Sequence, residues 1–232
     1  MDSIGMLDPA EFTTEALCRS MLARHRDTIG VRKPEVAIRK LTVIIKAALE
    51  VSNRKGFQAM SLRDLSQISG VSMGGLYAYF DSKTTLLNMI LQEVAEQVRR
   101  VLADPPGEVA ADPVAHLTWL IETHIRLTEA MLPWFGFAFL EAKTFPPSER
   151  RAAADSEIET EAYFARVIER GVAEGRFRTE TSPLLASLIK PLLQDWYVKR
   201  AKYRRREVAI ETYIATVQDF VLRACLADRN GG

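Results

Sequence analysis

The chain has 232 residues, of which 47% are hydrophobic and 26% are charged, a balance typical of folded proteins that excludes wholesale disorder. No run of about 18 apolar residues occurs, which excludes a membrane span, and acidic Asp2 and Asp8 precede any basic residue, which argues against a secretory signal; we therefore expect a cytoplasmic protein. Two cysteines, Cys18 and Cys225, are too few for a disulfide framework or a four-cysteine zinc site.

The net charge of +1 hides an uneven distribution along the chain. Residues 36–85 carry seven Lys or Arg and three acids, a local charge of +4. This early module of about fifty residues therefore has a modest electrostatic footprint for binding phosphates.

Apolar residues recur every three or four positions along almost every long segment, and strand-like alternation is nearly absent, so the pattern predicts an all-α protein. Residues 1–35 form an N-terminal extension in which residues 11–28 have the composition of one extra helix. Its basic and acidic residues balance. The extension could therefore be a solvated helix or an arm that touches DNA.

Residues 36–85 read as three helices. A first helix from Val36 ends at Gly56, and Ser61, with Asp64 three residues later, caps a second, short helix that ends at Gly70. Ser72 then caps a third helix that extends to about residue 80. Two short helices joined by a tight turn with glycine are typical of a helix-turn-helix motif.

The remainder, residues 86–232, is predicted to be a separate helical domain. A long helix runs from residue 83 to about 101, and prolines near residues 105, 133 and 146 mark breaks. Further helices are expected at about residues 113–131, 148–174, 183–197 and 207–227.

One stretch sharpens this interpretation: residues 70–83, Gly-Val-Ser-Met-Gly-Gly-Leu-Tyr-Ala-Tyr-Phe-Asp-Ser-Lys. Ala47-Ala48, Gly56-Phe57 and Leu62-Arg63-Asp64-Leu65 stand upstream of it at matching distances. Together these residues resemble the DNA-binding domain of the TetR family of transcriptional regulators. The resemblance implies an N-terminal helix-turn-helix domain followed by a helical domain for ligand binding and dimerisation.

Several residues in this module have chemistry suited to DNA. Gly74 and Gly75 are costly inside a helix, so we expect close approach to another surface, or alternatively a loop. The hydroxyls of Tyr77 and Tyr79 can donate to phosphates, unless both rings are core, and Lys83 at a helix start favours a bound phosphate over a merely solvated lysine. Ser61 and Ser72 either cap only or cap and touch phosphate.

By resemblance, Arg63 and Met73 align with positions that reach base edges. Arginine can grip guanine with two hydrogen bonds, whereas methionine offers only apolar contact. Arg63 could instead pair with nearby acids. The sequence departs from the family at Gly75, where threonine is usual, and this puts any contact carried over there in doubt.

The resemblance also implies a dimer through the last two helices and an effector pocket before them. For each residue the alternative is ordinary core. The dimerisation candidates are Leu188, Trp196, Tyr213, Val217 and Phe220, and the pocket candidates are His116, Trp119, His124, Trp134, Phe137 and Tyr163.

No metal site or cofactor is expected, because His116 and His124 are two helical turns apart with no cysteine nearby. Six basic residues between positions 199 and 206 read as a solvated loop or as a site for an anionic group. No nucleophile with a base and no phosphate-binding glycine loop after a strand is found, so we do not expect an enzyme.

We therefore expect a homodimeric repressor that binds a palindromic operator in double-stranded DNA and leaves it when a small apolar or acyl-type effector binds the C-terminal domain. No membrane partner is expected. The alternative is a DNA-binding regulator controlled by a protein partner.

Overall fold

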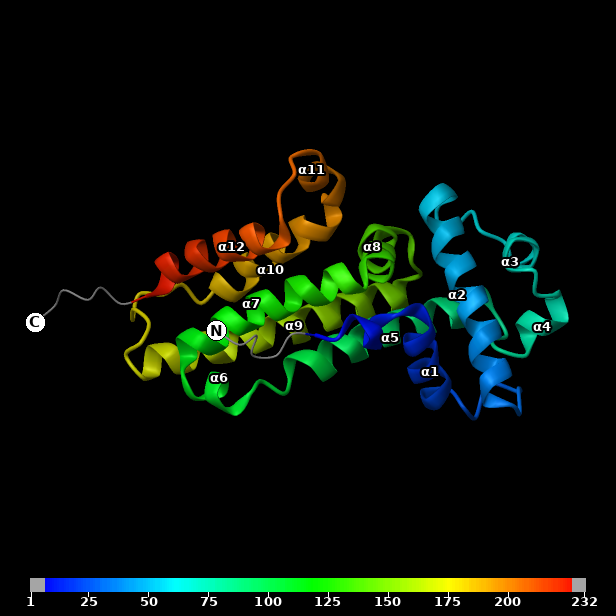
Figure 1. Cartoon of the computed structure of the whole chain (residues 1–232), viewed down its shortest axis with the longest axis horizontal. Helices are drawn as coiled ribbons and strands as arrows, with labels where there is room; N and C mark the ends of the chain where they lie inside the picture. Colours follow the sequence, from blue (N-terminus) through cyan, green and yellow to red (C-terminus); the bar gives the residue numbers. More distant parts are fainter. Residues whose placement is uncertain (1–6, 227–232) are drawn as a thin grey trace, which may run out of the picture. The chain divides into compact units, whose positions relative to one another are not determined.

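The computed structural model describes residues 7–226, and its regular structure is helical (Figure 1). The expected all-α fold is confirmed: the described part contains no strand, only one isolated β-bridge between Phe177 and Leu226. Two short 3-10 turns, Pro9–Phe12 and Ala142–Thr144, accompany the α-helices. The helices are α1 Thr14–Arg24, α2 Pro34–Lys55, α3 Leu62–Ser69, α4 Met73–Tyr77, α5 Lys83–Leu102, α6 Gly107–Ala111, α7 Pro113–Ala130, α8 Leu132–Leu140, α9 Pro147–Ala173, α10 Leu185–Val198, α11 Arg200–Arg205 and α12 Ile210–Cys225.

The chain divides into two compact units. The N-terminal unit comprises Asp8–Glu96 and Ala130–Ala153, and the described part of the C-terminal unit comprises Gln97–Glu129 and residues 154–226. The domain boundaries expected at residues 36 and 86 stay a prediction. The contacts group α1 and α8 with the helix-turn-helix segment.

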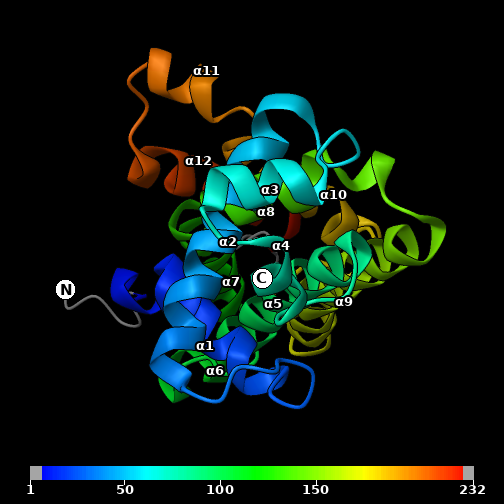
Figure 2. The same ribbon diagram turned by 90° about the vertical axis from the view of Figure 1, so that its right-hand side faces the viewer.

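The N-terminal unit is built on α2. Its apolar stripe, with Leu41, Ile44 and Ile45 fully buried, faces α1, α3 and α8, and Figure 2 shows α1 and α3 against different parts of α2. Burial also raises the pKa of the Cys18 thiol to about 12, which keeps it protonated and unreactive.

In the C-terminal unit, α7 is a largely buried helix. Leu117, Leu120, Ile121 and Ile125 on this helix are fully buried. Asp112 caps α7: its Oδ2 accepts a hydrogen bond from the N–H of Ala115 at 3.2 Å. None of the helices in the described part of the chain is both long and apolar enough to span a bilayer.

Candidate nucleic-acid interface

The start of α3 is fixed by a capping box. Ser61 Oγ accepts from the N–H of Asp64 at 3.1 Å, and Asp64 Oδ2 accepts from the N–H of Ser61 at 2.7 Å. Lys55 Nζ lies 2.8 Å from the same carboxylate. These bonds hold the pKa of Asp64 well below its usual range, so the carboxylate stays charged and α3 stays anchored to the end of α2.

Arg63, the second residue of α3, is exposed and has no hydrogen-bond or ion-pair partner among the described residues. The acid beside it, Asp64, is already paired with Lys55. The ion-pair alternative for Arg63 is therefore not what the structure shows. Its five donors are available to a partner outside the chain.

The turn between α3 and α4 is held by short-range hydrogen bonds. Gly70 ends α3 in the left-handed conformation with φ of 69°, which a residue with a Cβ adopts only at a cost. Ser66 Oγ donates to the carbonyl of Val71 at 2.7 Å, and Ser69 Oγ accepts from the N–H of Val71 at 3.2 Å. The two helices are therefore fixed at one crossing angle.

Helix α4 is only five residues long, and its two glycines differ in role. Ser72 Oγ caps it by accepting from the N–H of Gly75 at 3.2 Å. A Cβ on Gly75 would lie 2.8 Å from Val71 Cγ1, whereas one on Gly74 would meet nothing within 4 Å. Gly75 therefore allows the tight turn, which the sequence did not predict, and only Gly74 stays a candidate for close approach to DNA.

The two tyrosines also separate. The side chain of Tyr77 is 54% exposed, whereas that of Tyr79 is 1% exposed. The Tyr79 hydroxyl is buried with no hydrogen-bond partner among the described residues, and burial raises its pKa. The expected phosphate contact of Tyr79 is therefore wrong, because its ring is core, while the contact expected of Tyr77 stays a prediction.

Lys83 does not stand free at the start of α5. Its Nζ donates to the carbonyls of Phe57 at 3.2 Å, Gln58 at 2.9 Å and Met60 at 3.2 Å, and it lies 5.1 Å from the centre of the Phe57 ring. All three N–H groups are thus used inside the protein. The prediction that Lys83 binds a phosphate is therefore wrong: its ammonium group holds the segment between α2 and α3 in place.

Two cations on α2 were missed in the sequence. Arg39 and Lys40 are exposed and, with Val36, Val43 and the α3–α4 turn, line a hollow of about 330 Å³. Neither has an ion-pair partner among the described residues. Both counted toward the charge of +4, but only the helical register of α2 shows that they face the turn.

The comparisons with known proteins agree with this geometry. A sequence model of the bacterial regulatory proteins of the tetR family matches residues 44–90. The transcriptional repressor KstR of Mycolicibacterium smegmatis is 31% identical over 140 residues, which span 54% of this chain and 69% of that protein. The chain belongs to the TetR family.

Two further likenesses extend over most of this TetR-family chain. An uncharacterised transcriptional regulator of Bacillus subtilis, YfiR, is 28% identical over 189 residues, which span 79% of this chain and 90% of that protein. The crystal structure of a tetR-family regulatory protein from Rhodococcus has a TM-score of 0.67 at 22% identity, covering 80% of this chain and 97% of the other. The protein is thus a DNA-binding transcriptional regulator and not an enzyme.

The six effector-pocket candidates of this regulator are divided between the two units. Trp134 and Phe137 are buried in the N-terminal unit, where the Phe137 ring lies 5.5 Å from that of Phe57. The other four, His116, Trp119, His124 and Tyr163, belong to the C-terminal unit. Trp134, Phe137 and His124 are covered by the protein itself, so the expected pocket stays a prediction that rests on the partly exposed His116, Trp119 and Tyr163.

His124 forms part of a buried polar pair. Lys190 is only 8% exposed, and its Nζ lies 3.3 Å from His124 Nε2. Burial lowers the pKa of Lys190 to about 8 in spite of the nearby Glu157 and Glu161. Burial and the charge of Lys190 also lower the pKa of His124 well below its ordinary value, so a neutral imidazole accepts the hydrogen bond.

The dimerisation candidates differ in burial, as Tyr77 and Tyr79 do. Leu188 and Phe220 are each 61% exposed, so their place in a dimer interface stays a prediction. Trp196 and Val217 are buried in the protomer, and the hydroxyl of half-buried Tyr213 donates to the carbonyl of Leu192 at 2.7 Å. Trp196 and Val217 are therefore core residues, and Leu184, which is also exposed, joins the candidates.

The basic segment 199–206 contains a helix, α11, where a loop was expected. Arg200 binds Glu129 with two nitrogens and lies 4.5 Å from the Trp196 ring centre. Lys199 and Lys202 both pair with Asp195. Three of the six basic residues thus tie α11 to α10 and α7. Arg204, Arg205 and Arg206 are exposed and have no ion-pair partner among the described residues.

Proposed function

We propose that this TetR-family protein is a homodimeric repressor of a palindromic operator. The observation that carries the proposal is the unpaired, exposed Arg63 beside a turn whose own polar groups are satisfied. An exposed guanidinium on a fixed helix is suited to bidentate contact with a guanine. Met73, partly exposed at the start of α4, would add apolar contact.

Contacts to phosphate are assigned to other residues. Tyr77, Arg39 and Lys40 are exposed around the same turn, and Ser61 and Ser72 lie at helix starts. One helix-turn-helix segment, residues 36–85, called the reader below, makes few phosphate contacts. Two copies are therefore needed for tight binding at physiological salt. The exposed Leu184, Leu188 and Phe220 support the pairing of α10 and α12 between two copies.

The test uses a palindromic duplex selected from a random library. Two readers of a dimer should sit about one helical turn apart, roughly 34 Å, so scrambling one half-site should weaken binding strongly. Arg63→Ala should relax the preference at one base position, whereas Tyr77→Phe should weaken binding to duplexes of every sequence by the same factor. Equal affinity for intact and scrambled sites would overturn the proposal.

We further propose that release from the operator follows binding of a small apolar or acyl-type molecule to the C-terminal unit. The partly exposed aromatic side chains of Trp119 and Tyr163 support an apolar effector. A thermal-shift screen of lipids, acyl-CoAs and aromatic compounds measures this directly, because a ligand of the native state raises the melting temperature. If none does so, control by a protein partner is favoured instead.

A further inference from the structure

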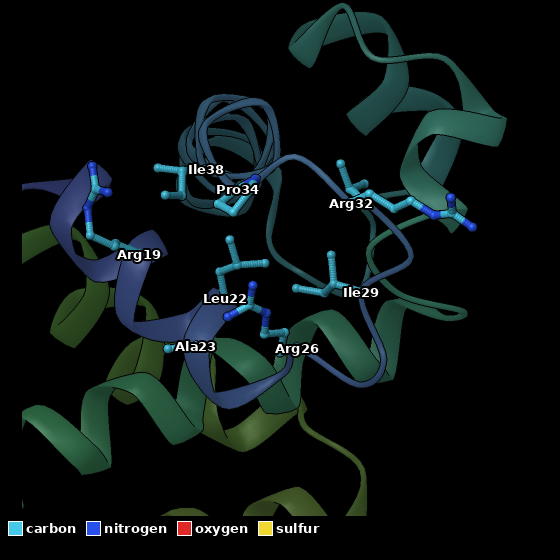
Figure 3. Close-up of a pocket in the computed structure, with 9 residues that line it drawn as sticks. Arg19, Leu22, Ala23, Arg26, Ile29, Arg32, Pro34 and Ile38 are labelled. Atoms are coloured by element: carbon cyan, nitrogen blue, oxygen red, sulfur yellow. The ribbon is translucent and has the colours of Figure 1, made fainter.

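A cavity of about 190 Å³ lies within the N-terminal unit, between α1, the loop formed by residues 25–33, and the start of α2 (Figure 3). Its floor is apolar, with the buried side chains of Leu22, Ile29 and Ile38. The family resemblance assigns nothing to this extension. The cavity is smaller than the roughly 300 Å³ of sites for drug-sized ligands, so only a compact molecule fits.

The walls of this cavity are fixed by backbone hydrogen bonds. The N–H of Ile29 donates to the carbonyl of His25 at 3.0 Å, and the N–H of Gly30 donates to the carbonyl of Ala78 at 3.0 Å. Pro34 begins α2 directly after the loop. The cavity therefore exists before any ligand binds, which reduces the entropic cost of binding.

The cavity is bordered by cations and by no acid. Arg19, Arg26 and Arg32 line it, and no Asp or Glu does. Arg19 is engaged by Glu15 at 3.5 Å and Glu35 at 3.4 Å. Arg26 and Arg32 have no hydrogen-bond or ion-pair partner among the described residues. The charge at this site is thus positive and partly uncompensated.

The two unpaired arginines point differently. Figure 3 shows Leu22, Ile29 and Pro34 around one space with the guanidinium of Arg26 beside Leu22, whereas the guanidinium of Arg32 extends away from that space. Arg26 is therefore the residue placed to bind a charged group of a cavity occupant. Arg32 serves as its matched control on the same loop.

We propose that this cavity binds a compact apolar monocarboxylate, such as an aromatic or short branched acid. The carbon skeleton covers the apolar floor, and the carboxylate pairs with Arg26, whose planar guanidinium matches it with two parallel hydrogen bonds. A single guanidinium neutralises a single negative charge. The cavity thus forms a second small-molecule site, separate from the effector site proposed in the C-terminal unit.

Binding there is coupled to the reader. Ile29 lines the cavity, and the adjacent Gly30 is hydrogen-bonded to Ala78, the residue that directly follows α4. An occupant also neutralises one positive charge on the reader unit, which lowers its attraction for phosphates. The acid therefore weakens operator binding, and by linkage the operator weakens binding of the acid by the same factor.

The test compares three probes on the full-length protein by ligand-observed NMR titration. Benzoate carries both features of the proposed ligand, benzamide has the same shape without the charge, and inorganic phosphate has charge without a carbon skeleton. We expect benzoate to bind at least tenfold more tightly than either of the others. Equal binding of benzoate and benzamide would show that Arg26 does not select a carboxylate and would overturn the proposal.

Variants locate the site. Arg26→Gln should weaken the binding of benzoate at least tenfold. Ala23→Leu, which fills the cavity from α1, should weaken it as much. The affinity of Arg32→Gln for benzoate should stay within twofold of wild type. Benzoate binding unchanged in both Arg26→Gln and Ala23→Leu would place it elsewhere and refute the proposal. If Arg26→Gln instead weakens every duplex and leaves benzoate binding intact, Arg26 is a phosphate contact and the proposed site is wrong.

Discussion

The helix-turn-helix segment and the α10–α12 region are held together over different distances along the chain. In the former, side-chain hydrogen bonds join Ser61 to Asp64, Ser66 to Val71 and Ser72 to Gly75, at most five residues apart. In the latter, four of the side-chain bonds join partners that are 66 to 100 residues apart. These pairs are Lys190 with His124, Trp196 and Arg200 with Glu129, and Gln218 with Thr118.

This difference decides which groups stay available to partners. Local bonds satisfy polar groups around the α3–α4 turn and leave Arg63 and Tyr77 exposed. In the α10–α12 region several cations and aromatic rings are used in packing: Arg200 lies against Trp196, and both contact Glu129. Substitutions should therefore impair DNA binding in the first region and folding in the second.

The largest expected effect is that of Trp196→Ala. Trp196 is 0% exposed, its Nε1 donates to Glu129 at 2.8 Å, and its ring stacks on Tyr203 at 5.3 Å. Its removal should lower the free energy of unfolding by about 3–5 kcal/mol, as measured by urea denaturation at fixed protein concentration.

The control for this substitution is the exposed aromatic residue of the reader. Tyr77→Ala should change the free energy of unfolding by no more than about 0.5 kcal/mol while weakening DNA binding. If the two variants unfold at the same urea concentration, the contrast between the regions is wrong.

Lys190→Met should stabilise the protein at neutral pH. The pKa of Lys190 is about 8 in the folded protein against 10.5 ordinarily, so at pH 7 folding buries a charge that the unfolded chain solvates. We expect the variant to be up to about 2 kcal/mol more stable there, because the relief of this desolvation outweighs the loss of the donor to His124 Nε2.

The sign of the pH dependence follows from the lowered pKa. Between pH 8 and 10.5 the unfolded chain binds more protons at Lys190 than the folded protein, so this residue makes wild type more stable as the pH rises. The difference in urea midpoint between variant and wild type should therefore shrink over that interval, and other titrating groups cancel in it. A difference that is constant with pH would mean that Lys190 is not desolvated.

Lys83→Met should destabilise the protein by about 1–3 kcal/mol, because three carbonyls lose their donor. Lys55→Met removes an ion pair between partly exposed side chains and should cost no more than about 1 kcal/mol. Thermal unfolding of the two variants measures the contrast. Wild-type stability of Lys83→Met together with weaker binding to every duplex would restore its role as a phosphate contact.

Local patterns in the sequence predicted the frame of the reader. The capping box at Ser61 and Asp64, the cap at Ser72 and the helix ends at Gly56 and Gly70 all depend on residues within a few positions of one another. Such motifs act through short-range hydrogen bonds and are therefore legible in one sequence. This is why the fold and the position of the reader could be predicted.

The predictions that failed concern residues whose surroundings are set by tertiary packing. Tyr77 and Tyr79 are the same residue type two positions apart, and only the folded chain places one ring outside and the other in the core. Lys83 bonds carbonyls 23 to 26 residues before it. The apolar period of α10 likewise marks Leu188 and Trp196 alike, although one is exposed and the other buried.

The smallest expected effect distinguishes the two glycines of α4. Gly74→Ala should stabilise the free protein by about 0.5–1 kcal/mol, because alanine is the better helix former and its methyl group meets nothing within 4 Å. In Gly75→Ala the contact with Val71 offsets that gain, so the two variants should differ by about 1 kcal/mol. Thermal unfolding in the absence of DNA measures this difference.

DNA binding should reverse the order of these two variants. If the backbone of α4 approaches the duplex at Gly74, the added methyl weakens binding to all sequences several-fold, although the free protein is more stable. Gly75→Ala changes the inner side of the turn and should affect DNA binding only as far as it loosens the helix. Wild-type affinity of Gly74→Ala would mean that no surface comes close to this residue, and the contacts of α4 would then rest on Met73 and Tyr77 alone.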